Sequence, residues 1–427
     1  MAAVVDVDSH VYEPTEIWES YVPTELRALA RSAFYHEVDA DGNRLTVLNG
    51  GSARDLNRSR LVRQAIWRPG MTPESIGQLD PDVFQPLTPG ASDPAARLSD
   101  MDAMGVDVAV VFPTLFGEYL PLVENPDAAA VLARAYNDWV WDFAGQGNGR
   151  LHPVAIVPMH APLLAQRELD RVAEKGFRSV VIRPAFYNAP VIEEHNLQAQ
   201  MSQAIKRLVA AGSGGADLGS RTFVEDIPYR AVWRHLADLD LVACVHPSVG
   251  ITGPDAVSSG GFAERVSHRL GATHTVAEPI AYMQDADLFL TAALFHGLLE
   301  DHPGLRLAFA HCGASWVPLA LEKCETYLWL SPQFGHAQVC LEPEEVWDRH
   351  PALVSFDGWE RSVGRMPDRL GQKAAWGSRY PNHDTSTPAE ARAMLLGEGV
   401  DEPTVDALLG GHAAALFDLP VPAGSPA

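Results

Sequence analysis

The sequence predicts an α/β fold, a (β/α)8 TIM barrel, and three observations support this prediction. Short apolar runs alternate with stretches of helical periodicity, a pattern typical of a parallel sheet whose strands are buried on both faces. Eight such runs can be counted, which is the number of strands that closes this barrel. A doubly wound open sheet would alternate similarly, but no GxGxxG sequence follows the first run, and His, Asp and Arg stand at the run ends instead.

The predicted strands and helices follow in chain order. Proline is accepted in the first turn of a helix, so Pro126 marks the start of one helix. Gly176 marks the end of the next helix, because glycine favours the residue after a helix end. Two further helices are predicted after the last strand, at 389–397 and 402–410. The predicted strands are 4–8, 106–113, 154–159, 179–184, 241–246, 305–311, 353–357 and 374–378.

The chain is predicted to form one domain over residues 1–414. Its 427 residues are 47% hydrophobic, which is enough to bury one large core. Two segments break the alternation, 24–100 after the first strand and 188–227 after the fourth. We predict that both are excursions covering the mouth of the barrel, where long loops tend to carry function. The Pro- and Ala-rich tail, 415–427, is predicted to be disordered.

Composition excludes several classes of partner. A net charge of −23 repels nucleic acid and anionic membranes, because binding to either depends on clustered Lys and Arg. We find no signal sequence and no uninterrupted run of about 20 apolar residues, so we expect a cytoplasmic protein without a membrane span. The four cysteines lack CxxC spacing and are interpreted as free thiols.

Four polar side chains at predicted strand ends point to chemistry. Asp8 and His10 are two residues apart on the first strand and therefore share a face. His246 and His311 end the fifth and sixth strands, and the carboxyl ends of barrel strands are where catalytic groups gather. A carboxylate with neutral imidazoles suits Zn²⁺ or Mn²⁺. One such histidine alone is equally well a hydrogen-bonded strand end, but three together favour an active site.

The order of several motifs is similar to that of the ACMSD-like amidohydrolases, which include aminocarboxymuconate semialdehyde decarboxylase and related decarboxylases and hydrolases. The motifs are Asp-Ser-His-Val-Tyr-Glu-Pro at 8–14, Met-Gly-Val-Asp at 104–107, Phe-Pro-Thr at 112–114, Val-His-Pro at 245–247 and Gly-Ser-Arg-Tyr-Pro at 377–381. The resemblance spans residues 4–414. It implies metal ligation by Asp8, His10 and His246, and acid/base work by His311, whose imidazole can exchange a proton near neutral pH.

The eighth strand departs from the family pattern, Gly-Ser-Asp-Tyr-Pro-His. Arg379 stands where the family has an aspartate that ligates metal and handles protons. An arginine can neither ligate a cation nor act as a base near neutral pH, and its charge repels a metal. Three interpretations remain open: His383 or Asp384 supplies the function, the metal is held by the other three ligands alone, or no metal binds and Arg379 holds an anionic substrate. An internal ion pair with Asp8 is the purely structural interpretation of Arg379.

Two further residues are predicted to contact substrate. Arg183 ends the fourth strand and can bind a carboxylate or carbonyl oxygen, although pairing with a neighbouring acid would explain it equally well. His160 follows the third strand and can face the barrel mouth, whereas a lone histidine in a loop often has no such role.

These observations lead to one function and two alternatives. We expect an amidohydrolase-like enzyme that hydrolyses or non-oxidatively decarboxylates a small carboxylated or cyclic organic molecule, an anionic substrate, with Zn²⁺ or Mn²⁺. Its catalytic residues are expected to be His311, Arg379 and Asp384. The alternatives are a metal-free lyase, isomerase or cyclase in which Arg379 replaces the usual aspartate, and a degenerate homologue that binds a ligand without chemistry. The resemblance also implies a homodimer, for which the predicted helix at 279–300 offers apolar residues such as Leu288.

Overall fold

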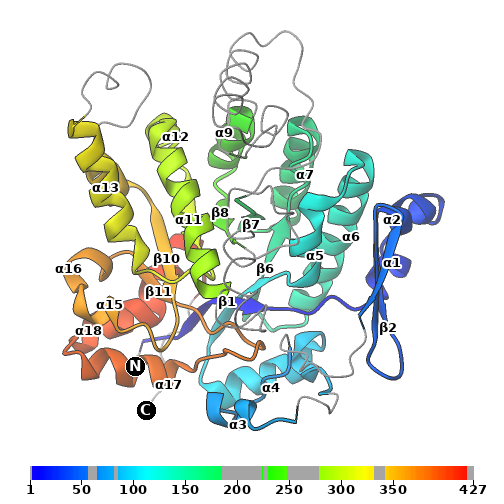
Figure 1. The fold of residues 1–427 in the computed structure, drawn as a ribbon, viewed down its shortest axis with the longest axis horizontal. Helices are drawn as coiled ribbons and strands as arrows, with labels where there is room; N and C mark the ends of the chain where they lie inside the picture. Colours follow the sequence, from blue (N-terminus) through cyan, green and yellow to red (C-terminus); the bar gives the residue numbers. More distant parts are fainter. Residues whose placement is uncertain are drawn as a thin grey trace, which may run out of the picture.

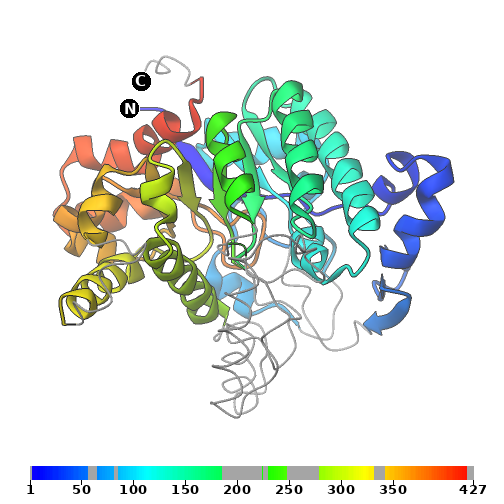
Figure 2. The ribbon, with the colours of Figure 1, turned by 90° about the horizontal axis from the view of Figure 1, so that it is seen from above.

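The centre of the molecule is a sheet of eight parallel strands ringed by helices (Figures 1 and 2). The computed structural model describes residues 2–55, 65–80, 85–184, 224, 229–247, 278–330 and 342–420. Each of the eight predicted runs overlaps one strand, so the predicted (β/α)8 barrel is confirmed. In spatial order the strands are β1 (Val5–His10), β5 (Val108–Phe112), β6 (Leu151–Ile156), β7 (Ser179–Ile182), β8 (Val242–Val245), β9 (Arg306–Phe309), β10 (Ala352–Phe356) and β11 (Ala374–Trp376).

The barrel closes where the first and last strands meet. The amide of Arg379 donates to the Asp8 carbonyl at 2.7 Å, and the amide of His10 donates to the Tyr380 carbonyl at 2.6 Å. The buried carboxylate of Asp6 adds a bond from the amide of Ser378 at 2.8 Å. We call residues 8–10 and 378–380 together the seam. It lies at the carboxyl ends of the strands, where barrel enzymes place their active sites.

Strand β1 contains a bulge just before the seam. Asp6 lies opposite Ala109 of β5, whereas Ser9 lies opposite Val111, so three steps along β1 match two along its partner. A bulge of this kind bends the strand and re-aims the side chains that follow it. Beyond the bulge the ladder resumes, with Ser9 opposite Val111 and His10 opposite Phe112.

The opposite end of the barrel is covered by the last helix, α19 (His412–Phe417). Its apolar side chains Ala413, Leu416 and Phe417 are buried against Val5 and Val7 of β1. The domain end predicted at residue 414 therefore falls inside a helix, and residues 415–417 are helical rather than disordered because the barrel interior buries two of their side chains. Residues 421–427 of the predicted tail lie outside the described part of the chain.

Helices surround the sheet, and their ends follow local sequence signals. Pro126 is the first residue of α6, whose amides at Asp127 and Ala128 are capped by Asn125, and Gly176 ends α7 at φ 105°. The predicted helix at 279–300 is two helices, because Gly297 takes a left-handed conformation at φ 69° between them. The surrounding helices are α6 (Pro126–Gly145), α7 (Pro162–Lys175), α9 (Arg230–Asp238), α11 (Glu278–Phe295), α12 (Leu298–Asp301), α13 (Trp316–Leu330), α14 (Pro343–Arg349), α15 (Ser362–Arg365), α16 (Pro367–Leu370), α17 (Pro388–Gly397) and α18 (Glu402–Asp406).

The first excursion divides between the flank of the barrel and its mouth. It contains helices α1 (Ile17–Ser20) and α2 (Arg27–Ala33) and an antiparallel sheet of β2 (Phe34–Val38), β3 (Arg44–Leu48) and β4 (Gly51–Asp55). Helices α1 and α2 pack on α6, so this part lies at the flank and does not cover the mouth (Figures 1 and 2).

The later part of the excursion, with α3 (Pro73–Gly77) and α4 (Pro94–Met104), reaches the seam. The amide of Trp67 donates to Pro381 at 2.9 Å, and the amide of Tyr12 donates to Ala91 at 2.9 Å. The second excursion, 188–227, lies outside the described residues apart from Val224. Among the described residues, no helix combines the length and apolar character that crossing a membrane requires.

Candidate metal centre

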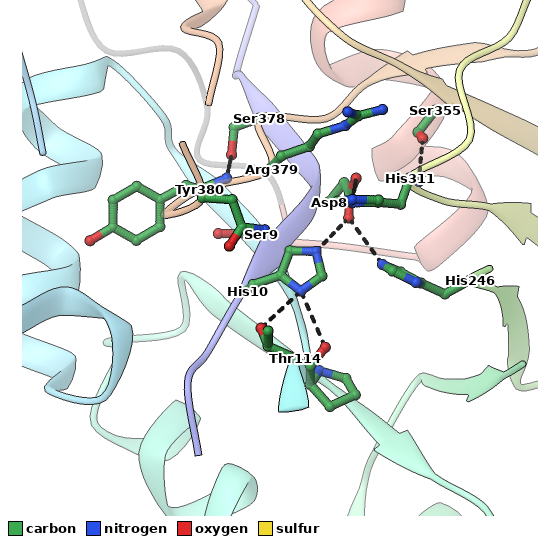
Figure 3. Close-up of polar contacts among 12 residues, drawn as sticks. Asp8, Ser9, His10, Thr114, His246, His311, Ser355, Ser378, Arg379 and Tyr380 are labelled. Atoms are coloured by element: carbon green, nitrogen blue, oxygen red, sulfur yellow. Dashed lines mark hydrogen bonds and ion pairs between the residues drawn. The ribbon is translucent and has the colours of Figure 1, made fainter. Parts of the chain in front are cut away.

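Four side chains from three strand ends converge at the carboxyl end of the barrel (Figure 3). Asp8 and His10 belong to β1, His246 follows β8, and His311 follows β9. Each offers one potential ligand atom, and these atoms all lie within 4.8 Å of one another. The sequence-based expectation that Asp8, His10 and His246 point to one place thus agrees with this geometry, and His311 joins them.

Asp8 is the centre of this group. Its Oδ1 lies 3.1 Å from Nε2 of His10 and 3.7 Å from Nε2 of His246, and its Oδ2 lies 3.0 Å from Nδ1 of His311. Burial acts to raise the pKa of Asp8, but the interaction with His311 and the hydrogen bonds from His10 and His311 hold it well below its usual value. Asp8 is therefore an anion surrounded by rings.

Backbone oxygens orient two of the imidazoles. Nδ1 of His10 lies 3.2 Å from the carbonyl of Pro113, and Nδ1 of His246 lies 2.9 Å from the carbonyl of Pro247. A carbonyl can only accept, so each Nδ1 carries a proton, and Nε2 is the ring atom that would bind a metal once it has no proton. Histidines that bind metals are oriented in this way by a bond from their other nitrogen.

The donor set fits a divalent cation. Nε2 of His246 is buried and has no hydrogen-bond partner among the described residues, an arrangement that is rare for a buried polar atom unless something binds it. Burial lowers the pKa of His246 below its usual value and that of His311 to about 4, so both rings are neutral at pH 7 and can act as ligands. Three imidazoles and one carboxylate suit Zn²⁺ and Mn²⁺ alike.

Arg379 pairs with two acids other than Asp8. Its Nη1 lies 2.8 Å from Oδ2 of Asp384 and its Nη2 lies 3.9 Å from Oδ2 of Asp357. The side-chain ion pair considered for Arg379 and Asp8 is not formed; only the backbone of Arg379 bonds to the Asp8 carbonyl. The two carboxylates offset the guanidinium charge, so Arg379 is a weaker obstacle to a nearby cation than its sequence position suggested.

Asp384 and His383 lie beside Arg379 and outside the four-residue group. Burial acts to raise the pKa of Asp384, but the guanidinium of Arg379 lowers it to about 2. Asp384 is therefore ionised at neutral pH. In this arrangement it holds Arg379 in place and is not positioned as a replacement metal ligand.

Arg183 and His160 are both buried and bonded to neighbouring backbone. Arg183 follows β7 and donates through Nη1 to the carbonyl of Glu118 at 2.6 Å. His160 is fully buried, with Nε2 3.0 Å from the carbonyl of Leu120, and burial lowers its pKa to about 4. This interior hydrogen bond accounts for His160 without a substrate. The structure does not bring either residue into the four-residue group.

Two residues near the site were missed by sequence reasoning. The ring of Tyr282 on α11 stands edge-on to His311, with centroids 4.9 Å apart, although this helix had been interpreted only as a packing surface. Asp357 follows β10 and faces Arg379. Its place at the end of a predicted strand was a signal that could have identified it, whereas nothing in the sequence around Tyr282 singles it out.

Comparison with known proteins assigns the chain to a family. A profile of the amidohydrolase family matches residues 6–419. The chain belongs to this family. The gamma-resorcylate decarboxylase of Rhodococcus jostii strain RHA1 is 23% identical to it over 219 residues, 51% of this chain and 55% of that protein. The match thus spans about half the length of that relative.

Solved structures of amidohydrolases share the fold over almost the whole chain. An amidohydrolase from Mycobacterium avium subsp. paratuberculosis K-10 has a TM-score of 0.71 at 18% identity, with 99% of each chain covered. A dihydroxybenzoic acid decarboxylase from Polaromonas sp. JS666, with bound manganese and the inhibitor 2-nitroresorcinol, has a TM-score of 0.60 at 14% identity, covering 98% of this chain and 97% of that one. The 5-carboxyvanillate decarboxylase of Sphingomonas paucimobilis has a TM-score of 0.60 at 17% identity, covering 98% and 100%.

Proposed function

We propose that this amidohydrolase is a metal-dependent enzyme that removes CO₂, without oxidation, from a small aromatic or cyclic carboxylate. The observation that carries the proposal is the buried group of Asp8, His10, His246 and His311 beside a paired arginine. The names of its relatives supply the reaction class, because several are decarboxylases of hydroxylated aromatic acids. If no decarboxylation is found, hydrolysis by the same site becomes the favoured reaction.

The metal would be held by Asp8, His10 and His246, whose Nε2 and carboxylate atoms face one another. A divalent cation in this position supplies a Lewis acid that stabilises negative charge on a substrate oxygen. We propose Mn²⁺ or Zn²⁺, since the donor set suits both and the Polaromonas relative carries manganese.

Arg379 is the residue that we assign to the substrate carboxylate. One of its terminal nitrogens is bonded to Asp384, and the other is only loosely paired with Asp357 at 3.9 Å. A guanidinium can donate two parallel hydrogen bonds to a second carboxylate, which would orient an anionic substrate. Asp384 acts by holding the guanidinium, and Arg183 remains a second proposed contact at the barrel mouth.

His311 is the residue that we assign to proton transfer. Departure of CO₂ leaves an electron pair on the substrate carbon, and that carbon must take up one proton. Asp8 bonds Nδ1 of His311 at 3.0 Å, which fixes the ring and leaves its other nitrogen to exchange a proton. We propose that this nitrogen passes a proton from a substrate hydroxyl to the carbon that CO₂ leaves.

The test combines metal content with product analysis. The wild type and His246→Ala would be incubated with 2,6-dihydroxybenzoate and 5-carboxyvanillate, with CO₂ release followed and bound metal measured by plasma mass spectrometry. We expect about one Mn or Zn per wild-type chain, loss of activity on chelation and a metal-poor variant. Release of CO₂ that survives exhaustive chelation would overturn the metal-dependent mechanism and favour metal-free chemistry at Arg379.

The role of Arg379 has its own control. Arg379→Met removes the guanidinium from the site, whereas Arg365→Met removes an exposed one that pairs with Glu398. We expect the first variant to raise KM for an anionic substrate by about 10-fold or more, as loss of a charged hydrogen bond predicts, and the second to leave KM unchanged. Equal KM values for both variants would remove Arg379 from substrate binding.

We also propose that the protein is a homodimer that associates through α11. Leu288 on this helix is 49% exposed, and a large exposed apolar side chain on a barrel helix can pack against a second copy. Sedimentation should give the mass of a dimer for the wild type and a lower mass for Leu288→Arg. A wild-type monomer at micromolar concentration would contradict this.

We further propose a cytoplasmic location. The described cysteines Cys244, Cys312 and Cys324 are buried free thiols, which suits a reducing compartment. Fractionation of the source cells, with the protein detected by antibody, would test this. Recovery outside the cytoplasm would contradict it.

A further inference from the structure

Arg97 is a buried cation that the proposed chemistry does not use. It lies on α4, within the predicted first excursion, and its side chain is fully buried. Arginine is almost never buried unless its donors are paired, and here all three of its nitrogens donate. Nε bonds the Gly90 carbonyl at 2.7 Å, Nη1 bonds Oγ of Ser9 at 3.1 Å, and Nη2 bonds the carbonyl of His10.

The same guanidinium also covers the other half of the seam. Its central carbon stands 4.5 Å from the ring centroid of Tyr380, the residue that follows Arg379. The Tyr380 hydroxyl donates to Asp100, which is on α4 together with Arg97. The Tyr380 carbonyl accepts the amide of His10, which joins the two chain segments at the seam. Arg97 contacts both segments.

Gly90 shows how tightly this contact is built. A Cβ added there would collide with the Tyr380 hydroxyl and would lie 2.9 Å from Oδ2 of Asp100 and 3.1 Å from the Cα of Arg97. Only glycine fits here without displacing these groups. The segment 88–91 therefore packs closely against α4 and Tyr380.

We infer that Arg97 is a positioning residue for the metal centre, which it serves by fixing the backbone of His10. The bulge in β1 interrupts the ladder just before Ser9 and His10, and Arg97 adds side-chain contacts to both residues where the ladder to β5 resumes. Arg97 binds Oγ of the first residue and the carbonyl of the second, while the ring of His10 bonds Asp8 at 3.1 Å. The orientation of the imidazole therefore depends on a side chain that touches neither metal nor substrate.

This inference rests on the proposed metal site and is specific about what should change. Loss of a residue that orients a metal ligand lowers metal affinity by about 10–100-fold in characterised sites. We expect Arg97→Met to raise the Kd for Mn²⁺ in this range. Arg97→Lys, which restores the charge but not the three-way donor set, should fall between the variant and the wild type.

The matched control is another paired arginine remote from the seam. Arg171 bonds Glu168 and Asp138 between α6 and α7, so Arg171→Met removes a charged network without contact to His10. Both methionine variants should lose thermal stability, but only Arg97→Met should lose Mn²⁺ affinity, measured by electron paramagnetic resonance of free Mn²⁺ on protein shown to be folded by circular dichroism. Ser9→Ala removes one acceptor of Arg97 and provides a milder second variant if Arg97→Met does not fold.

Two outcomes overturn the inference. The first is an unchanged Mn²⁺ affinity in Arg97→Met, or in Ser9→Ala if Arg97→Met does not fold. The second is an equal loss of Mn²⁺ affinity in Arg171→Met. If the wild type binds no metal, the proposed function fails separately, and crystal structures of the metal-free wild type and variant then give the answer. We expect the His10 backbone and ring to be displaced in the variant. A His10 that stays in place there would also overturn the positioning role.

Discussion

At the scale of single residues, the seam and the adjoining Arg97 side chain contain charges that would be unfavourable if any one of them lost its partner. Asp8, Arg97 and Arg379 are all buried, and each makes several polar contacts. Removing one member of a buried pair leaves the other uncompensated, which is more destabilising than the pair itself is stabilising. Individual substitutions here should therefore have large effects whose dependence on pH reveals the partner.

Asp384→Asn should lower the free energy of unfolding by about 2–3 kcal/mol at pH 7. Arg379 depresses the folded-state pKa of Asp384 to about 2, below the unfolded value of about 3.9. A depressed pKa stabilises the fold above the unfolded value, and this contribution disappears as the pH falls through 3.9 toward 2. Urea unfolding at pH 7 and pH 3 should show the wild type and variant converging at the lower pH.

Asp418→Asn is the control for this change. Asp418 pairs with Arg178 at the surface, where its side chain is 78% exposed, so its removal should change the free energy of unfolding by less than about 1 kcal/mol. An Asp384→Asn effect that is equal at both pH values would contradict the ion pair with Arg379.

At the scale of elements, the loop after β11 and helix α17 hold each other by local hydrogen bonds. Thr387 caps α17 by accepting the amide of Glu390, while the Glu390 carboxylate accepts the amide of Thr387 at 2.7 Å. The preceding residue, Ser386, accepts the amide of Gly358 at 3.0 Å and the indole N–H of Trp376 at 3.2 Å. The cap therefore supports the loop that carries Asp384 without touching the metal ligands.

Thr387→Ala should lower the free energy of unfolding by about 1 kcal/mol, because the amide of Glu390 loses its acceptor and the Glu390 carboxylate loses the bond from the hydroxyl. Thr387→Ser keeps the hydroxyl and should retain most of the stability. Chemical unfolding of both variants, with metal content measured in parallel, is the appropriate measurement. A metal loss in Thr387→Ala as large as in His246→Ala would contradict a purely local role for the cap.

The elements also show what the sequence could and could not predict. The eight strands and the meeting of Asp8 with His10, His246 and His311 were predictable, because apolar runs fix the strands and parallel strands share one carboxyl edge. The partner of Arg379 was not, since it depends on the path of residues 380–384 beyond the strand. The role of Arg97 was also hidden, because on a helix an arginine is ordinarily solvated.

The small antiparallel sheet in the first excursion was missed for a different reason. Its middle strand, β3, is only half-buried apart from Thr46, so the alternation of apolar and polar residues there is weak. Its neighbours are joined by Asp39–Asn43 and Asn49–Gly50, turn residues that were present in the sequence but were interpreted as part of an excursion. The sheet packs against α2, which in turn packs on α6, and such tertiary contacts are not visible in the sequence.

At the scale of the whole molecule, the two ends of the barrel differ. One end holds the candidate metal centre, and the other is covered by α19. The residues of the candidate metal centre and Arg379 lie at the carboxyl ends of the strands, whereas α19 buries Leu416 and Phe417 at the opposite end. The C-terminal helix therefore contributes stability without contact to the site. Its removal and the removal of a metal ligand should have separable consequences.

Phe417→Ala should lower the free energy of unfolding by about 3–5 kcal/mol, the range for truncating a fully buried phenylalanine. Leu396→Ala on α17 is the control, because Leu396 is 39% exposed and should cost about 0.5 kcal/mol or less. Calorimetry gives both values, and metal content per folded chain should be unchanged in each. A Phe417→Ala variant as stable as the wild type would show that α19 does not close the barrel.

The seam has a consequence for how the protein is made. Asp8 belongs to the first strand and Arg379 follows the last, yet their backbones share a hydrogen bond. A chain emerging from the ribosome exposes β1 long before β11 exists, and an unpaired strand edge is prone to associate with other chains. The ligand-bearing end of β1 cannot take its final form until almost the whole chain has been translated.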